Sequence, residues 1–230
     1  MNQQLALAIQ FNHRETLTDF FWGENQLLKQ SLEQTLEKKG EQFIYLWGTP
    51  GSGKSHLLQG CCQYLDNQQP SAYLPLSILE PWGPSSIEGF GQQRLIAIDD
   101  IDSIAGDKAW EEALFHLFNR VRDNGQTILL ISAQKAPANS SILLPDLRSR
   151  LGWGLVFHLA ELSDELKIKV LQQAATKRGF TLPDQAALFL IKRCARNMHT
   201  LNQLLNRLDE ASLVLQRKIT VPFIKTILDL

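Results

Sequence analysis

The amino-acid sequence predicts an α/β protein: a parallel sheet covered by helices, followed by a small all-helical domain. Three observations predict this fold class. Five short apolar runs alternate with helical patterns, as expected for parallel strands joined by helices. A glycine-rich segment that fits a phosphate-binding loop directly follows the first of these runs. After residue 161 the strand-like runs stop, and only helical patterns remain.

The five expected strands are short and apolar. The first, residues 43–47, is rich in aromatic and β-branched side chains, which is typical of a buried strand. The other four span residues 73–76, 95–98, 128–132 and 155–159. Helical patterns lie between them, for example at residues 108–122.

A further helix is expected before the first strand, at residues 26–39. Its apolar face carries Leu27, Leu28, Leu32 and Leu36. We expect the helix to end at Gly40, because glycine is common at helix C-caps.

The C-terminal part contains helical patterns at residues 163–178, 183–196, 200–216 and 221–230. Asp164 and Glu165 suit the positive end of the first helix dipole, and Gly179 follows its last turn. We therefore expect an N-terminal segment (1–25), an α/β nucleotide-binding domain (26–161) and a helical lid domain (162–230).

Composition excludes several classes of protein. The chain has 230 residues, 44% of them hydrophobic, so it can bury a full core and is neither disordered nor fibrous. Its 23 basic and 24 acidic side chains give a formal net charge of -1. No strong overall field therefore attracts it to DNA or to an anionic membrane, and any contact with DNA is expected to be local or indirect.

The sequence favours a cytoplasmic protein without a membrane contact. No apolar run approaches the roughly 20 residues needed to cross a bilayer. Residues 5–9 are too short and too interrupted for a signal sequence. Cys61, Cys62 and Cys194 are an odd set without metal-ligand spacing, so we expect them to be reduced and mostly buried.

The glycine-rich segment carries the clearest chemistry. It fits G-x-x-x-x-G-K-[ST] at every fixed position, with the residues Gly48, Thr49, Pro50, Gly51, Ser52, Gly53, Lys54 and Ser55. In such a loop backbone N–H groups surround the phosphates, the lysine reaches the β and γ oxygens, and the serine hydroxyl binds Mg²⁺. We expect ADP or ATP to bind here, with His56 beside it. A glycine-rich turn with a solvated lysine is the alternative.

Two carboxylates end the third apolar run. Asp99 is the candidate for the second contact with Mg²⁺, alongside Ser55. Asp100 is the candidate for orienting or deprotonating an attacking water. The alternative is a helix N-cap or a turn, where aspartate is common.

Three segments together resemble the AAA+ module of the bacterial replication initiator DnaA and its relatives, most closely the smaller Hda family of DnaA regulators. They are residues 48–55, 95–100 and 147–154. The resemblance covers nearly the whole chain, from residues 20–25, similar to the family's adenine-side segment, to residues 220–225. It implies a P-loop AAA+ fold with a helical lid. DnaA's C-terminal DNA-binding domain has no counterpart here, so direct recognition of duplex DNA is not expected.

The resemblance also implies an arginine finger. Arg150 matches the arginine of the family's Ser-Arg-hydrophobic-x-Trp-Gly segment. A guanidinium is always charged and can donate two hydrogen bonds to phosphoryl oxygens, here in a neighbour's site. Without the resemblance, the better interpretation of Arg148 and Arg150 is that they are solvated or salt-bridged side chains.

Two sensor positions depart from the family pattern. His199 stands where the family's lid carries an arginine that senses nucleotide. Histidine is shorter and only partly charged near neutral pH, and a surface role is the alternative. Gln134 and Ser132 are both candidates for the polar sensor that follows the fourth strand.

The N-terminal residues Gln4, Leu5, Leu7 and Ile9 resemble the peptide by which the Hda family docks on the β sliding clamp. An apolar strand or a disordered terminus is the alternative.

The expected function is therefore regulatory: nucleotide-bound protein on the DNA-loaded clamp presents Arg150 to ATP held by DnaA and promotes its hydrolysis. Such a finger presupposes a neighbour, so a homo-oligomer is also considered. The alternatives are a self-contained ATPase resembling helicase loaders and a non-hydrolysing adaptor.

Overall fold

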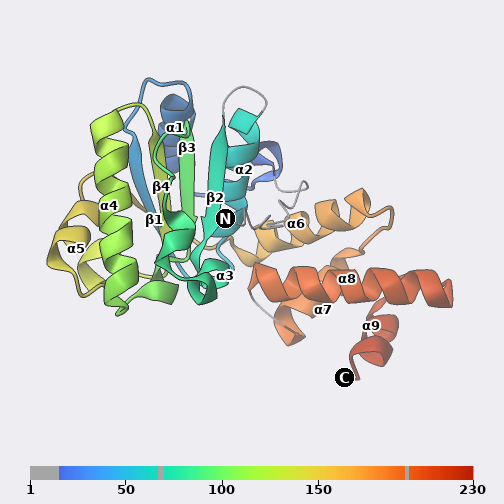
Figure 1. Ribbon diagram of the computed structural model, residues 1–230. Coiled ribbons are helices and arrows are strands. Elements are labelled where there is room, and N and C mark those ends of the chain that lie inside the picture. Colours follow the sequence, from blue (N-terminus) through green and yellow to red (C-terminus); the bar gives the residue numbers. More distant parts are fainter. Residues whose placement is uncertain (1–15, 67–69, 195–196, 230) are drawn as a thin grey trace.

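A five-stranded parallel sheet forms the centre of the larger part of the molecule (Figure 1). The computed structural model describes residues 16–66, 70–194 and 197–229. Strand order is β2-β3-β4-β1-β5, and every pair is parallel. The strands are β1 Phe43–Trp47, β2 Ser71–Pro75, β3 Leu95–Asp99, β4 Ile128–Ala133 and β5 Leu155–His158. The expected fold class is confirmed.

Helices cover both faces of the sheet. They are α1 Gln26–Leu36, α2 Lys54–Asp66, α3 Leu76–Leu79, α4 Lys108–Asn124 and α5 Pro145–Leu151. Short 3-10 helices occur at Leu17–Asp19, Glu80–Trp82, Pro84–Ile87, Ile101–Ile104 and Pro137–Asn139. In Figure 1, α4 and α5 lie on one side of the sheet, and α2 lies on the other.

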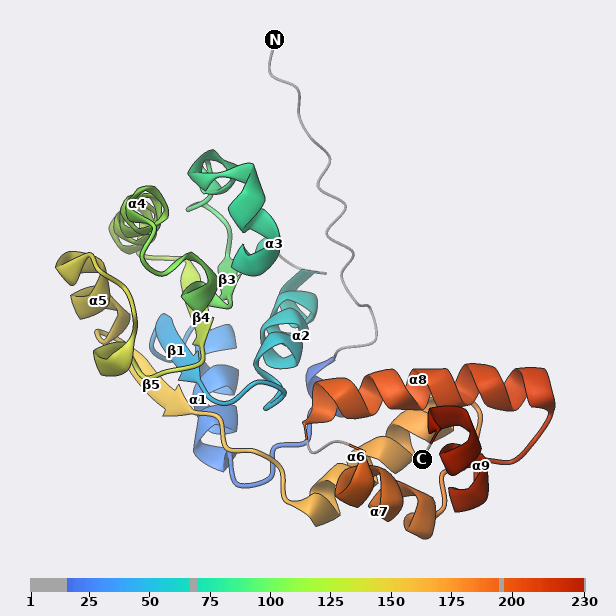
Figure 2. The same ribbon diagram turned by 90° about the horizontal axis from the view of Figure 1, so that it is seen from below.

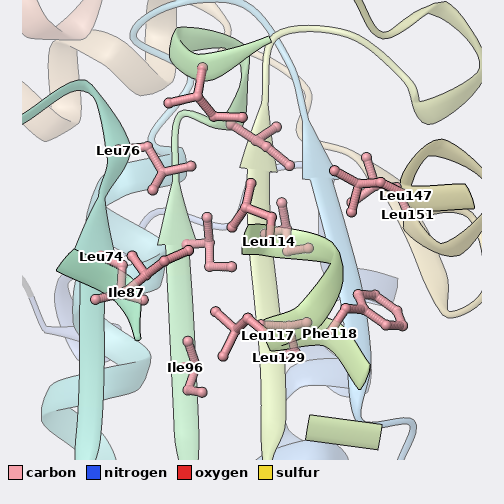
Figure 3. Packing of buried hydrophobic residues seen from close by; sticks show 14 of the residues in the cluster. Leu74, Leu76, Ile87, Ile96, Leu114, Leu117, Phe118, Leu129, Leu147 and Leu151 are labelled. Atoms are coloured by element: carbon pink, nitrogen blue, oxygen red, sulfur yellow. The ribbon is translucent and has the colours of Figure 1, made fainter. Parts of the chain in front are cut away.

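Alternating side chains along each strand divide the core between the two faces. On β4, Leu129 and Ile131 pack on the face covered by α3, α4 and α5, whereas Ile128 and Leu130 pack on the face covered by α1 and α2. Figure 3 shows Leu117 of α4 above Leu129, as part of the first of these two cores. Strands β1 to β4 are mostly apolar because helices cover both of their faces, whereas β5 at the edge of the sheet is largely exposed.

The first helix differs from its expected form. Leu28, Leu32 and Leu36 are buried, but Leu27 is 69% exposed, so the apolar face is narrower than expected. The helix ends at Leu36, and Lys38 takes the left-handed conformation that Gly40 was expected to take (φ 64°). A Cβ on Gly40 would lie 2.9 Å from the Thr35 backbone nitrogen, so close packing explains the glycine.

Four helices form the C-terminal lid, with a core of their own (Figure 2). They are α6 Asp164–Lys177, α7 Asp184–Arg193, α8 Met198–Leu215 and α9 Val221–Leu228. Side chains cap three of them, because Ser163, Asn197 and Thr220 each accept a hydrogen bond from a first-turn N–H. The domain boundary expected near residue 161 falls between β5 and α6.

Cys61 and Cys62 are buried, Cys194 is partly buried, and all three are free. No helix in the described ranges is long and apolar enough to cross a membrane.

Candidate nucleotide-binding site

The glycine-rich loop lies between β1 and α2, at the carboxyl edge of the sheet. Gly51 (φ 82°) and Gly53 (φ 102°) take backbone conformations that other residues rarely adopt. A Cβ on Gly48 would lie 2.7 Å from the Leu159 carbonyl oxygen. The sequence pattern thus forms a tight phosphate-binding loop that opens a helix, the context in which the motif binds phosphates.

Lys54 begins α2, and its side chain folds back over the loop. Its Nζ donates hydrogen bonds to the carbonyl oxygens of Gly48 (2.7 Å) and Thr49 (2.9 Å). Burial lowers the pKa of Lys54, and the nearby carboxylates of Asp99, Asp100 and Asp102 oppose that shift. The ammonium therefore lies between two carbonyl oxygens of the loop and the carboxylates that follow β3.

A cavity of about 400 Å³ adjoins the loop. Its walls come from four parts of the chain: residues 19–21, residues 50–56 of the loop and the first turn of α2, Leu162 and Val170 before and on α6, and residues 197–199 with Asn202 at the start of α8. The lid comes close to the loop, since a Cβ on Gly51 would lie 3.0 Å from the Asn197 Cβ. The lid therefore forms one wall of the site.

This cavity fits an adenine nucleotide. Ser52 Oγ is buried and has no hydrogen-bond partner among the described residues, so a ligand oxygen at the loop would satisfy it. Phe20, Leu162 and Val170 supply apolar wall at which a base can pack. Lys54 and Ser55, which also line the cavity, supply the charge and the hydroxyl that phosphates and Mg²⁺ require.

Two hydroxyl groups from neighbouring strands hold the carboxylate of Asp99. Tyr73 on β2 donates its phenol proton to Oδ2 (2.5 Å), and Ser132 on β4 donates to Oδ1. Asp99 is buried, at the end of β3 between those two strands. The sequence singles out Ser132 only as a sensor candidate and gives Tyr73 no polar role, because only the strand order brings the two hydroxyl groups to Asp99.

Asp100 follows in the left-handed conformation (φ 59°), which turns the chain sharply at the end of β3. Its N–H donates to Ser132 Oγ (2.8 Å), and the Gln134 side chain forms a hydrogen bond with its carboxylate. Burial raises the pKa of Asp100, and the neighbouring charges of Asp99 and Asp102 raise it further. Of the two sensor candidates, Ser132 is engaged by Asp99 and Asp100, while the Gln134 side chain contacts Asp100.

The candidate Mg²⁺ residues, Ser55 and Asp99, supply one hydroxyl and one carboxylate. Within the described ranges no group of three or more His, Cys, Asp or Glu could hold a metal. Mg²⁺ at nucleotide sites keeps waters and takes phosphate oxygens as further ligands, so such a pair is sufficient there.

The two histidines of the candidate site differ in their surroundings. His199 is exposed, lines the cavity, and places its Nε2 2.9 Å from the amide nitrogen of Gln203. The Nε2 of His56 lies 3.1 Å from the Thr16 carbonyl oxygen, and its ring packs edge-on against Phe20. His56 therefore holds the segment before α1 against the first turn of α2.

One polar link between loop and lid has no sequence signal. The Thr49 hydroxyl donates to Oε1 of Glu161, and Lys167 of α6 contacts Oε2 of the same carboxylate (3.3 Å). Lys167 is buried, although lysine rarely is. The hydrogen bond from Thr49, followed by the contact with Lys167, lowers the pKa of Glu161.

Arg150 lies outside this cavity. It belongs to α5, which packs on α4 at the side of the molecule away from the lid (Figures 1 and 2). Its guanidinium carbon lies 4.0 Å from the centre of the Phe115 ring and 5.5 Å from that of Trp153, and Nη1 donates to Asn119 Oδ1. No acidic side chain within the described ranges pairs with it.

The expected clamp-binding residues Gln4, Leu5, Leu7 and Ile9 lie outside the described residues.

Comparison with known proteins decides the family. Residues 88–158 match the model of the bacterial DnaA ATPase domain, and residues 164–228 match the model of the Hda lid domain. The chain belongs to the DnaA-related AAA+ family. Its lid is of the Hda type, as the sequence motifs predict. An uncharacterized protein of Haemophilus influenzae is 48% identical over 231 residues, which cover 100% of both chains.

Solved structures of the initiator DnaA and of a branch migration motor share the fold. Domain III of the Thermotoga maritima replication initiation protein DnaA superimposes with a TM-score of 0.81 at 21% identity, covering 94% of this chain and 95% of that one. AMPPCP-bound DnaA from Aquifex aeolicus gives 0.70 at 20% identity, covering 86% and 66%. The Thermotoga maritima RuvB Holliday junction branch migration motor gives 0.69 at 21% identity, covering 96% and 73%.

Proposed function

We propose that this protein is a regulator of replication initiation that promotes ATP hydrolysis by DnaA and so inactivates the initiator. In this proposal it carries ADP or ATP at residues 48–55 and docks on the DNA-loaded sliding clamp through Gln4, Leu5, Leu7 and Ile9. The Hda-type lid and the DnaA-type ATPase region support the regulatory assignment. Contact with DNA is then indirect, through the clamp.

The position of Arg150, outside the nucleotide cavity of its own chain, is the observation that carries the proposal. An arginine that serves its own P-loop would line that cavity, and Arg150 is not among the described residues that do. Instead Phe115, Phe118 and Trp153 surround its guanidinium without neutralising it. Nη1 donates to Asn119, and cation–π contact leaves the other N–H groups able to bond phosphoryl oxygens. We infer that Arg150 donates to the ATP of an adjacent DnaA molecule.

The resident nucleotide would be held by Lys54, Ser52 and Ser55, with Mg²⁺ at Ser55 and Asp99. A bound Mg²⁺ neutralises phosphate charge. Held by Tyr73 and Ser132, Asp99 is oriented for one metal contact, and Asp100 remains the candidate for positioning a water. His199, across the cavity on α8, is the lid residue that faces the nucleotide in this proposal.

The experiment is DnaA ATP turnover with and without this protein, in the presence of clamp and DNA. We expect wild-type protein to raise turnover, and Arg150→Ala to abolish the increase while its own nucleotide affinity is unchanged. Lys54→Ala is expected to abolish nucleotide binding by this chain. Unchanged stimulation by Arg150→Ala contradicts the proposal.

A second candidate is a self-contained ATPase that remodels other proteins, as helicase loaders do. The observation that favours it is the complete set of loop lysine, Asp99 and a partly buried Asp100 whose pKa is raised. Strong turnover by the isolated protein, insensitive to Arg150→Ala, would support this candidate and contradict the first.

A further inference from the structure

A second polar cavity lies at the opposite edge of the sheet from the phosphate-binding loop, where the strands begin. It has a volume of about 670 Å³. Gln42, Pro70, Arg94 and Thr127, which line it, stand directly before β1, β2, β3 and β4. The cavity is therefore built on the rigid sheet and is separate from the nucleotide site.

Arg94 is the central residue of this cavity. Its backbone N–H donates to the Pro70 carbonyl (2.8 Å), and its carbonyl accepts from the Ile128 N–H (2.9 Å). The side chain is fixed at one end, because Nη1 donates to the Gln126 carbonyl (2.7 Å). The residue is only 9% exposed.

The other edge of the Arg94 guanidinium has no partner. Nε and Nη2 are both buried and find no acceptor among the described residues. Their N–H groups point in parallel, the fork that matches two oxygens of a carboxylate or phosphate. A buried cation left without an anion is strongly unfavourable, so this edge calls for an acceptor.

In Arg122 the Nε–Nη2 edge of the guanidinium does have an acceptor. Its Nε and Nη2 lie 3.3 and 3.1 Å from Oδ1 of Asp123, at the surface of α4. Arg94 has no such neighbour, since neither an Asp nor a Glu is among the described residues that line its cavity. Burial lowers the pKa of the Arg94 guanidinium, the direction expected for an unpaired buried cation.

The remaining lining supplies further positive charge and amide groups. Lys38 lines the cavity and is exposed, so it adds a second cation at the rim. The oxygen of the Gln93 side chain accepts from the backbone N–H groups of Gly91 and Gln92, which leaves its amide nitrogen as the group that can donate to a ligand. The set as a whole favours an anion.

We propose that this cavity binds a small oxyanion, a phosphate or carboxylate group, on the Nε–Nη2 edge of Arg94 with Lys38 at the rim. The edge is closed to water in this structure, so binding requires a shift of the lining side chains. A bond formed there is weakly screened, because little water surrounds it.

The test follows the Nε–H resonance of Arg94 by NMR in the full-length protein, assigned by its loss in Arg94→Lys. Inorganic phosphate and sodium succinate are titrated separately, with saturating Mg-ADP present so that the phosphate-binding loop is filled. We expect a saturable shift of the Arg94 resonance with at least one of the two anions. The anion that acts identifies the ligand as a phosphate or a carboxylate.

One variant and one control resonance complete the test. Lys38→Gln is expected to raise the anion concentration at half-saturation severalfold, because it removes a partly screened charge at the rim. The Nε–H resonance of Arg122 serves as the control, because that edge is already bound by Asp123. No saturable shift of Arg94 with either anion, or an equal shift of Arg122, would overturn the proposal.

Discussion

The carboxylate of Asp99 is held from both sides by hydroxyl groups that lie far from it in the sequence. Tyr73 and Ser132 lie on the strands that flank β3, so the sheet itself orients this side chain. A carboxylate fixed in this way loses little conformational freedom when it binds a metal or a water. The arrangement explains why a tyrosine stands at a position that apolar burial alone would fill with leucine or valine.

Tyr73→Phe tests this arrangement. The substitution keeps the ring and removes one hydrogen bond to a charged group, so we expect the free energy of unfolding to fall by about 1.5–3 kcal/mol. We also expect the Mg²⁺-dependence of nucleotide affinity to weaken, because Asp99 is then held by Ser132 alone. Urea unfolding and calorimetric titration with ADP, with and without Mg²⁺, measure the two effects. Tyr64→Phe, at an exposed tyrosine of α2, is the matched control, and equal effects of both variants would contradict the account.

The candidate residues of the nucleotide site are easier to predict from the sequence than the side chains that contact them. The loop residues 48–55 and the pair Asp99 and Asp100 follow from local patterns, because each pattern occupies consecutive positions beside a strand. Ser132 and Trp153 stand out in the sequence, as a sensor candidate and as part of the segment 147–154. The contacts of Tyr73 with Asp99 and of Phe115 with Arg150 have no local signal, since strand order and helix packing bring these residues together.

At the scale of helices and strands, side chains near the ends of these elements connect the phosphate-binding loop to the lid. Thr49, Glu161 and Lys167 join the phosphate-binding loop, the segment before α6 and α6 itself. Because the lid also contacts Gly51, a change in the loop changes the surface on which the lid rests.

Glu161→Gln is expected to destabilise the protein in a pH-dependent way. In the folded protein the pKa of Glu161 lies below its ordinary value of 4.5, so its stabilising effect is present above that value and is lost as the pH falls through the folded-state pKa. The expected loss at pH 7 is about 1 kcal/mol, because solvent at the half-exposed Glu161 screens its contact with Lys167. Urea unfolding from pH 7 to pH 3 checks this. A loss that does not shrink with acid, or an equal loss in Glu165→Gln in the first turn of α6, would speak against the link.

Gly51→Ala tests the contact between loop and lid. Gly51 and Gly83 have nearly the same positive φ (82° and 80°), but only Gly51 has the lid within 4 Å of an added Cβ. Backbone strain alone is expected to cost each variant roughly 1–3 kcal/mol. Only Gly51→Ala should also lower ADP affinity, which calorimetric titration measures. Equal ADP affinities in the two variants would show that the lid contact does not matter for binding.

The ends of the strands were predicted to within two residues, because polar segments on either side of a short apolar run mark where the strand begins and ends. Helix α1 shows where this reasoning fails. Four leucines suggest a wide apolar face, yet Leu27 faces solvent, and the helix ends before Gly40 because Lys38 takes the left-handed turn. Periodicity indicates which residues are apolar, whereas packing against the sheet decides which of them are buried.

At the scale of the whole molecule, the nucleotide cavity and Arg150 lie on different sides. The cavity is enclosed by the loop and the lid, and Arg150 lies on α5, away from the lid (Figure 2). One chain of this shape can hold its own nucleotide and present an arginine to a neighbour. This separation is what the regulatory proposal requires and what a self-contained ATPase does not need.

The most direct test is ATP turnover by DnaA, with clamp and DNA present, measured with wild-type protein, Arg150→Ala and Arg148→Ala. Arg148 is the matched control because it lies on the same helix, is exposed and carries the same charge. Arginine fingers contribute roughly 10³–10⁵ to the rate in other nucleotide hydrolases. We therefore predict that Arg150→Ala reduces the stimulated rate to that of DnaA alone, while Arg148→Ala retains most of it. Equal stimulation by Arg150→Ala and the wild-type protein would contradict the account.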